Sequence, residues 1–224
     1  MNTVLLLSGG LDSTTLLAQL VETEEDELGI GAVSFRYGQK HSIETEKAGL
    51  VAAYYGAEHI VVDLPEIFGR ESTILQGGTN PPHLTYKEIA EGKGPSPTVV
   101  PFRNANLISM ATTIAVVRGA SYVYAGMHAE DARGWAYPDC TPEFTGAMAN
   151  AVRVGTYDKV RFAVPFQWMM KAEIVQLGLR LNAPYDLTIS CYEGFEPACG
   201  KCPTCVERLE AFRVNHTTDP IPYA

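Results

Sequence analysis

The sequence predicts an α/β protein, with a Rossmann-like parallel sheet covered by helices on both faces and a small segment appended at the C-terminus. Short apolar segments typical of buried strands alternate with segments of helical periodicity. The first apolar segment ends in Gly9-Gly10, and a helix pattern follows at once. After Thr188 the chain becomes rich in Cys, Gly and Pro. We therefore expect an α/β domain over residues 1–187 and a separate segment over residues 188–224.

Five short strands account for the predicted sheet. The first is a continuous apolar run that ends at the two glycines, which is typical of a central parallel strand. The predicted strands are Val4–Leu7, Gly29–Phe35, His59–Asp63, Ser121–Gly126 and Arg161–Val164.

The predicted helices lie between these strands. Asp12-Ser13-Thr14 offers capping side chains for the first helix, whose buried face includes Leu20. The later helices are Ile43–Tyr55, Asn104–Arg118, Pro142–Val154 and Lys171–Leu181. Residues 69–101, rich in Gly and Pro, are predicted to form a long surface excursion, and residues 127–141 a loop.

Composition excludes several classes of protein. The 224 residues are 46% hydrophobic and 19% charged, which is ordinary for a soluble globular domain. The net charge of −9 argues against a nucleic-acid-binding protein, because such proteins neutralise phosphates. No apolar run approaches the roughly 20 residues that span a membrane, and the N-terminus lacks the basic residues of a targeting signal. We expect a cytoplasmic protein without a membrane or nucleic-acid partner.

The segment Ser8-Gly9-Gly10-Leu11-Asp12-Ser13 joins the first strand to the first helix. An open α/β sheet binds ligands at this junction, where backbone N–H groups and the helix N-terminus favour phosphate. The segment lacks the Lys of a P-loop and the third Gly of a dinucleotide motif. It resembles the pyrophosphate-binding loop of adenylating ATPases, which cleave ATP to AMP and pyrophosphate.

Four of the five cysteines lie close together near the C-terminus. Cys191, Cys199, Cys202 and Cys205 have the spacing Cys-x7-Cys-x2-Cys-x2-Cys. Four thiolates suit a structural zinc ion, and an iron–sulfur site or a redox Cys-x-x-Cys pair is the alternative. The distant Cys140 is either an inert buried thiol or part of a substrate pocket.

The loop and the cysteine cluster occur together with four further strings, over Phe35–His41, Val100–Asn104, Tyr137–Cys140 and Leu187–Tyr192. In this combination the chain resembles the 7-cyano-7-deazaguanine synthases of the queuosine pathway, from about Val4 to Phe212. The resemblance implies an adenine nucleotide alpha hydrolase-like fold and a homodimer. It also implies an ATP-dependent ligase that uses Mg²⁺, structural Zn²⁺ and ammonia.

The implied reaction begins with 7-carboxy-7-deazaguanine. ATP adenylates the carboxylate, and ammonia displaces AMP to form the amide. A second ATP activates the amide oxygen, and loss of AMP leaves the nitrile. Adenylation makes a poor leaving group into a good one, and a loop of preorganised donors can hold the departing pyrophosphate.

The resemblance also implies roles for individual residues. The catalytic residues are expected to be Asp12, Ser13, Arg103 and Lys171. The nucleotide is expected to contact Leu7, Ser8, Gly9, Gly10, Leu11, Asp12, Ser13, Thr14, Thr15, Leu16, Leu17, Ser34, Phe35 and Gly126. The substrate is expected to contact Tyr37, Gln39, His41, Arg103, Asn104, Glu130, Asp131, Tyr137 and Asp139. The four clustered cysteines are expected to bind the zinc ion.

Two departures from the family pattern lie near the expected substrate site. The step from Glu130-Asp131 to Tyr137 is longer than usual, and Ile189 stands where the family often has Trp. Three alternative functions therefore stay open. They are an enzyme that stops at 7-amido-7-deazaguanine, a tRNA-modifying adenylating enzyme, and a non-catalytic zinc-dependent interaction module.

Overall fold

A parallel sheet forms the centre of the protein. The computed structural model describes all residues except 24–28, 40–42, 70–71, 79–90, 92–95 and 195. Its five strands are β1 (Thr3–Leu6), β2 (Ile30–Arg36), β3 (Glu58–Asp63), β4 (Tyr122–Tyr124) and β5 (Arg161–Ala163). They are all parallel, in the order β3-β2-β1-β4-β5. The order reverses beside β1, and ligands of such sheets bind at the carboxyl ends of the strands on either side of that point.

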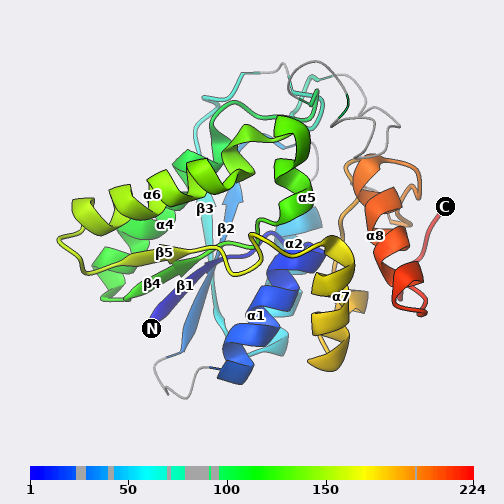
Figure 1. Ribbon diagram of the computed structural model, residues 1–224, viewed down its shortest axis with the longest axis horizontal. Coiled ribbons are helices and arrows are strands. Elements are labelled where there is room, and N and C mark those ends of the chain that lie inside the picture. Colours follow the sequence, from blue (N-terminus) through cyan, green and yellow to red (C-terminus); the bar gives the residue numbers. More distant parts are fainter. Residues whose placement is uncertain (24–28, 40–42, 70–71, 79–90, 92–95, 195) are drawn as a thin grey trace.

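Helices cover both faces of the sheet (Figure 1). On one face lie α4 (Arg103–Arg118) and α6 (Pro142–Gly155). On the other lie α1 (Leu11–Thr23), α2 (Ile43–Tyr54), α7 (Lys171–Arg180) and α8 (Pro203–Val214). Alternate residues of β1 point to opposite faces, so that Val4 packs in the first core and Leu5 in the second. Among the described helices, none has both the length and the apolar character needed to cross a bilayer.

The predicted strands and later helices are confirmed, each end lying within two residues of its expected position. Two expectations about local structure are wrong, and one helix was not predicted. Residues 127–141 form a short helix, α5 (Ala129–Ala132), and two 3₁₀ turns rather than an irregular loop. The C-terminal segment contains helix α8, whose first turn is rich in Cys and Pro and therefore did not indicate a helix in the sequence. Helix α1 begins at Leu11, so Asp12 lies inside its first turn instead of capping it.

The predicted excursion over residues 69–101 lies partly outside the described residues. Within its described part, Leu75 and Val100 are 2% and 3% exposed and belong to the core beside α4. This segment is therefore partly a component of the core, and not only a surface feature.

A buried ion pair lies within the C-terminal segment, and its arginine also donates a hydrogen bond to the main domain. Arg208, on α8, donates from Nε and Nη2 to both oxygens of Asp219, at 2.6 and 2.9 Å. Both side chains are 1% exposed. Arg208 also donates to Thr188 Oγ1 at 2.7 Å and to the carbonyl of Tyr185 at 3.1 Å. Helix α8 packs against α7, so these bonds fix the tail beside the sheet.

Asp219→Asn is expected to lower the free energy of unfolding by about 3–5 kcal/mol, because it leaves the buried Arg208 guanidinium without a counter-charge. Denaturant titration of the wild type and the variant measures this difference. Glu210→Gln is the matched control, since Glu210 lies on the same helix and forms an exposed pair with Arg213. The control should unfold like the wild type. Equal midpoints for all three proteins would contradict a structural role for the buried pair.

Candidate active site

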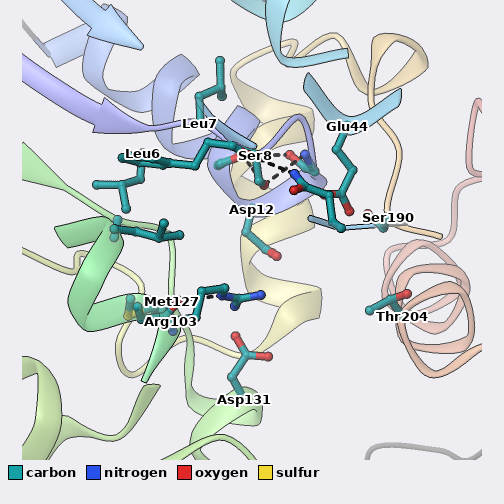
Figure 2. Close-up of a pocket in the computed structure, with 18 of the residues that line it drawn as sticks. Leu6, Leu7, Ser8, Asp12, Glu44, Arg103, Met127, Asp131, Ser190 and Thr204 are labelled. Atoms are coloured by element: carbon teal, nitrogen blue, oxygen red, sulfur yellow. Dashed lines mark hydrogen bonds between the residues drawn. The ribbon is translucent and has the colours of Figure 1, made fainter. Parts of the chain in front are cut away.

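A pocket of about 300 Å³ opens at the carboxyl ends of β1, β2 and β4. Side chains from α1, α4, α7 and α8 complete its wall. Figure 2 shows Asp12 and Asp131 pointing into this pocket from different elements, with Ser190 and Thr204 contributed by the C-terminal segment. The pocket therefore lies where the sheet topology predicts a ligand site.

The loop between β1 and α1 needs glycine at its second position. Gly9 has a φ of 79°, and a Cβ there would collide with the carbonyl oxygen of Glu44. The loop is also held by its own hydroxyl groups. Ser8 N donates to Ser13 Oγ at 3.2 Å, and Ser13 Oγ donates to the carbonyl of Gly10 at 3.2 Å. These bonds hold the loop in one shape at the N-terminus of α1, where an anion is favoured.

Asp12 and Lys171 form an ion pair on the pocket wall. Lys171 Nζ donates to Asp12 Oδ2 at 2.6 Å, and the two residues are 159 positions apart. Burial alone would raise the pKa of Asp12, but the charges of Lys171 and His128 hold it below its ordinary value. Burial alone would lower the pKa of Lys171, yet Asp12 and Glu207 raise it above its usual range. Both groups are therefore charged in the free protein, ready to interact with a phosphate or a cation.

Two further residues lie within reach of the Lys171 ammonium group. His128 Nε2 is 3.1 Å from Lys171 Nζ, and His128 is 1% exposed. Glu207 Oε2 is 3.3 Å from the same nitrogen. Burial raises the pKa of Glu207 to about 7, although the neighbouring Lys171 acts to lower it. The phosphate loop thus faces a compact cluster of titratable groups.

Glu130 and Asp131 position this cluster. Glu130 Oε2 accepts a hydrogen bond from the backbone N–H of Lys171 at 2.6 Å, and so satisfies one of the free donors at the start of α7. Asp131 Oδ2 lies 3.4 Å from His128 Nε2 and lines the pocket. Of these two predicted substrate contacts, only Asp131 reaches the pocket surface.

Another part of the pocket wall contains a partly buried cation. Arg103 Nη1 donates to Tyr37 Oη at 3.3 Å, and Arg103 Nε donates to Asn104 Oδ1 at 3.2 Å. Burial opposes the charge of Arg103, but Tyr37 and Asp139 raise its pKa above the ordinary value. Gln39 holds the end of β2, accepting from Tyr37 N at 2.7 Å and donating to the carbonyl of Phe35 at 2.9 Å. A permanent positive charge therefore faces the cavity and can attract an anionic ligand.

The Asp139 side chain forms its hydrogen bond with the protein backbone and does not face the pocket. Its Oδ2 accepts from the backbone N–H of Asn104 at 3.1 Å, near the start of α4. Asn104 Nδ2 donates in return to the carbonyl of Asp139 at 3.3 Å and to Cys140 Sγ at 3.4 Å. Asp139 does not line the pocket, whereas Asn104 and Cys140 do. Burial raises the pKa of the Cys140 thiol well above its ordinary value.

The four clustered cysteines meet in space. Their sulfur atoms lie within 4.8 Å of one another, and none forms a disulfide. Backbone N–H groups of Cys199 and Cys202 donate to Cys191 Sγ and Cys199 Sγ, at 3.4 and 3.3 Å. Hydrogen bonds from Cys202 and Cys205 lower the pKa of Cys191, which favours the thiolate form. This cluster could hold a metal ion such as zinc, in a closed site of four sulfur ligands.

The pocket brings together most of the residues predicted for it. Those that line it are Leu7, Ser8, Gly10, Asp12, Ser13, Ser34, Phe35, Tyr37, Gln39, Arg103, Asn104, Gly126, Asp131, Tyr137 and Lys171. Those that do not are Gly9, Leu11, Thr14, Thr15, Leu16, Leu17, Glu130 and Asp139. The three leucines pack in the core with at most 1% of their surface exposed, so their side chains offer nothing to a ligand. His41 lies outside the described residues.

Several residues of the site were not expected from the sequence. Glu44, Ser190, Tyr192, Thr204 and Glu207 line the pocket, and His128 lies behind it. Only His128 carried a usable signal, because it follows β4 by a few residues at the edge of the sheet where ligands bind. Glu207 lies on the helix that was missed. Burial raises the pKa of Glu44 to about 7, although Arg103 acts to lower it.

Sequence comparison identifies relatives over the whole chain. The family model described as queuosine biosynthesis protein QueC matches residues 2–216. A 7-cyano-7-deazaguanine synthase from Marinomonas sp. is 41% identical, over 98% of this chain and 97% of the relative. The enzyme of the same name from Archaeoglobus fulgidus is 42% identical, over 99% and 90%.

Solved structures show the same fold at much lower identity. The tRNA thiolase NcsA from Methanococcus maripaludis is 16% identical with a TM-score of 0.55, covering 96% of this chain and 65% of the other. NMN synthetase from Francisella tularensis is 14% identical with a TM-score of 0.54, covering 97% and 78%. These likenesses support an adenine nucleotide alpha hydrolase-like fold for the parallel sheet and its helices.

Proposed function

The chain belongs to the QueC family of queuosine biosynthesis proteins, and from this membership we propose that it converts 7-carboxy-7-deazaguanine to 7-cyano-7-deazaguanine. The proposed reaction consumes ammonia and two ATP, passes through an adenylated acid and an adenylated amide, and releases AMP and pyrophosphate at each activation. In this proposal the protein is a cytoplasmic homodimer that acts on a small molecule.

One observation carries the proposal. The Asp12–Lys171 ion pair, with Nζ and Oδ2 at 2.6 Å, faces the same pocket as the glycine loop and the partly buried Arg103. A phosphate-binding loop, a charged lysine and a site for an organic anion are the three elements that adenylation of a carboxylate requires. Their presence in one cavity supports an adenylating enzyme over a non-catalytic interaction module.

The loop is the proposed pyrophosphate site. The backbone N–H groups in the first turn of α1 offer donors there, and Lys171 supplies a positive charge beside them. Asp12 would position Lys171 and also contribute to binding Mg²⁺, because its Oδ1 has no hydrogen-bond partner among the described residues. When bound, Mg²⁺ supplies charge neutralisation for the phosphates.

Close backbone packing shapes the proposed adenine site. A Cβ at Gly126 would lie 3.3 Å from Asp12 C and Ser13 N, so this position must stay small for the end of β4 to approach α1. On the neighbouring strand, Ser34 Oγ donates to the carbonyl of Leu7 at 2.6 Å, which fixes the end of β2 against β1. Gly126, Ser34 and Phe35 all line the pocket at its strand edge.

The acid substrate is assigned to the part of the pocket lined by Arg103, Tyr37 and Tyr137. Arg103 would attract its carboxylate, and Tyr37 and Tyr137 would contact the flat heterocycle. Asp131 is the best placed of the predicted acidic residues to accept from substrate N–H groups, because Glu130 and Asp139 bond to backbone N–H groups and lie outside the pocket lining. This arrangement would place the carboxylate between Arg103 and the phosphate loop.

Incubation of the protein with ATP, Mg²⁺, ammonium and 7-carboxy-7-deazaguanine, followed by mass spectrometry, tests the function. We expect the nitrile, together with AMP and pyrophosphate. The alternative enzyme that stops at the amide would give a product heavier by one water. Unchanged acid, or release of ADP in place of AMP, would refute the adenylation chemistry.

A further inference from the structure

A second cluster of potential metal ligands lies behind the pocket wall, away from the four cysteines. One nitrogen of His128 and one oxygen each of Glu130 and Glu207 lie within 4.8 Å of one another. His128 directly precedes α5 and Glu130 lies in its first turn, whereas Glu207 comes from α8. One ion with bonds of roughly 2.0–2.6 Å can bridge ligand atoms this close.

Two of these side chains are deeply buried and have unsatisfied polar atoms. The His128 side chain is 1% exposed, and its Nδ1 has no hydrogen-bond partner among the described residues. The Glu207 side chain is 8% exposed, and neither of its oxygens has one. A buried polar atom without a partner costs about 1–3 kcal/mol, and a charged one costs more. Unsatisfied buried atoms of this kind in a folded protein indicate a binding partner, such as an ion.

The local charge also favours a cation. Asp12, Asp131 and Glu207 all line this side of the pocket, and Glu130 lies directly behind it. The ammonium group of Lys171 lies among them, bonded to Asp12 Oδ2 at 2.6 Å and to His128 Nε2 at 3.1 Å. Its 3.3 Å approach to Glu207 does not meet hydrogen-bond geometry, since both Glu207 oxygens stay unsatisfied. One lysine therefore leaves four carboxylates undercompensated.

The surroundings of His128 and Glu130 suit ligation. Lys171 Nζ is 3.1 Å and Asp131 Oδ2 is 3.4 Å from His128 Nε2, which leaves Nδ1 as the ring nitrogen without a partner among the described residues. A carboxylate on the second ring nitrogen is the usual companion of a metal-bound histidine. Glu130 is held through Oε2 by the backbone N–H of Lys171 at 2.6 Å, and its other oxygen can then bind the ion.

We propose that His128, Glu130 and Glu207 form a site for a first-row divalent cation of the Mn²⁺ type. A mixed imidazole and carboxylate set suits such an ion better than it suits Mg²⁺ or Ca²⁺, which prefer oxygen ligands alone. The site is distinct from the cysteine cluster and from the Mg²⁺ assigned to Asp12. Its use in neutralising ATP phosphates rests on the proposed function, whereas binding of the ion does not.

Binding of Mn²⁺ to the full zinc-loaded chain, without ATP or substrate, tests the site. Electron paramagnetic resonance measures free Mn²⁺ during the titration. We expect one Mn²⁺ per chain for the wild type, and at least about tenfold weaker binding for Glu207→Gln and for His128→Asn. Glu210→Gln is the matched control on the same helix, because Glu210 forms an exposed pair with Arg213, and it should bind Mn²⁺ like the wild type.

Zinc content and the far-ultraviolet circular dichroism spectrum identify variants that fail to fold. If Glu207→Gln loses zinc, its weaker Mn²⁺ binding is not interpreted. The Mn²⁺ affinity of His128→Asn then decides whether the site exists, because His128 lies far from the cysteines in sequence. Absence of Mn²⁺ binding by the wild type would overturn the proposal, as would equal binding by the wild type and both variants, or equal losses in the control. Nitrile formation is measured separately, so failure of the metal site and failure of the proposed reaction give different results.

Discussion

Asp12→Asn is expected to reduce pyrophosphate release from ATP by at least about 10²–10³-fold while the protein stays folded. Its carboxylate holds Lys171 at 2.6 Å and offers an unpartnered Oδ1 to the pocket. Asparagine keeps the shape of the side chain but removes the charge that orients the ammonium group and attracts Mg²⁺. Removal of one preorganised electrostatic contact typically costs this factor in rate, or about 2.7–4 kcal/mol.

Pyrophosphate release is measured with 7-carboxy-7-deazaguanine and ammonium present. Asp63→Asn is the matched control, because it makes the same substitution at an exposed aspartate, which pairs with Arg36 at 3.4 Å. The control should keep wild-type turnover, and both variants should keep zinc. A turnover of Asp12→Asn within tenfold of wild type would mean that this carboxylate is dispensable. Zinc loss in Asp12→Asn would show instead that the substitution acts through folding.

The elements predicted most accurately from the sequence are those whose own residues decide them. The strand β1 is a continuous apolar run ended by two glycines, and α6 begins at the Thr141-Pro142 start signal, where Thr141 Oγ1 accepts from Phe144 N. Helix α8 was missed because its first turn contains Pro203 and Cys205, which are typical of a metal-binding loop. Its helical form depends on packing against α7, which the local sequence does not reveal.

The residues of the site also fall into two groups, those that the local sequence reveals and those that only the packing of distant elements brings together. The phosphate loop is local, so its Ser and Gly residues could be recognised directly. The partnership of Asp12 with Lys171 spans 159 positions, and nothing in either neighbourhood specifies the other. Glu207 looks like a solvated helix residue in the sequence, yet its side chain is 8% exposed in the structure. Buried charges of this kind are determined by how distant elements pack, and not by spacing along the chain.

Loss of the zinc ion that we expect in the cysteine cluster should have the second large effect, because the cluster lies beside one wall of the pocket. Cys205 lies in the first turn of α8, between Thr204 and Glu207, and both of these line the pocket. Cys191 also lines it. Structural zinc is worth roughly 10–16 kcal/mol in zinc-finger peptides, comparable to the whole stability of a domain. Cys205→Ser should therefore disorder residues 188–212 and abolish turnover.

Hydrogen exchange resolves this effect along the chain. In Cys205→Ser we expect zinc content to fall well below one per chain and amide protection to be lost over α8, while β1 and β4 stay protected. Cys140→Ser is the matched control, since Cys140 is buried but lies apart from the cluster, and it should retain zinc. Retention of zinc and of α8 protection in Cys205→Ser would mean that this sulfur is not a ligand. Loss of protection in the sheet as well would mean that the C-terminal segment and the α/β domain unfold as one unit. The bond from Arg208 to the carbonyl of Tyr185 and the α7–α8 contact would then couple them more strongly than the zinc ion stabilises the tail alone.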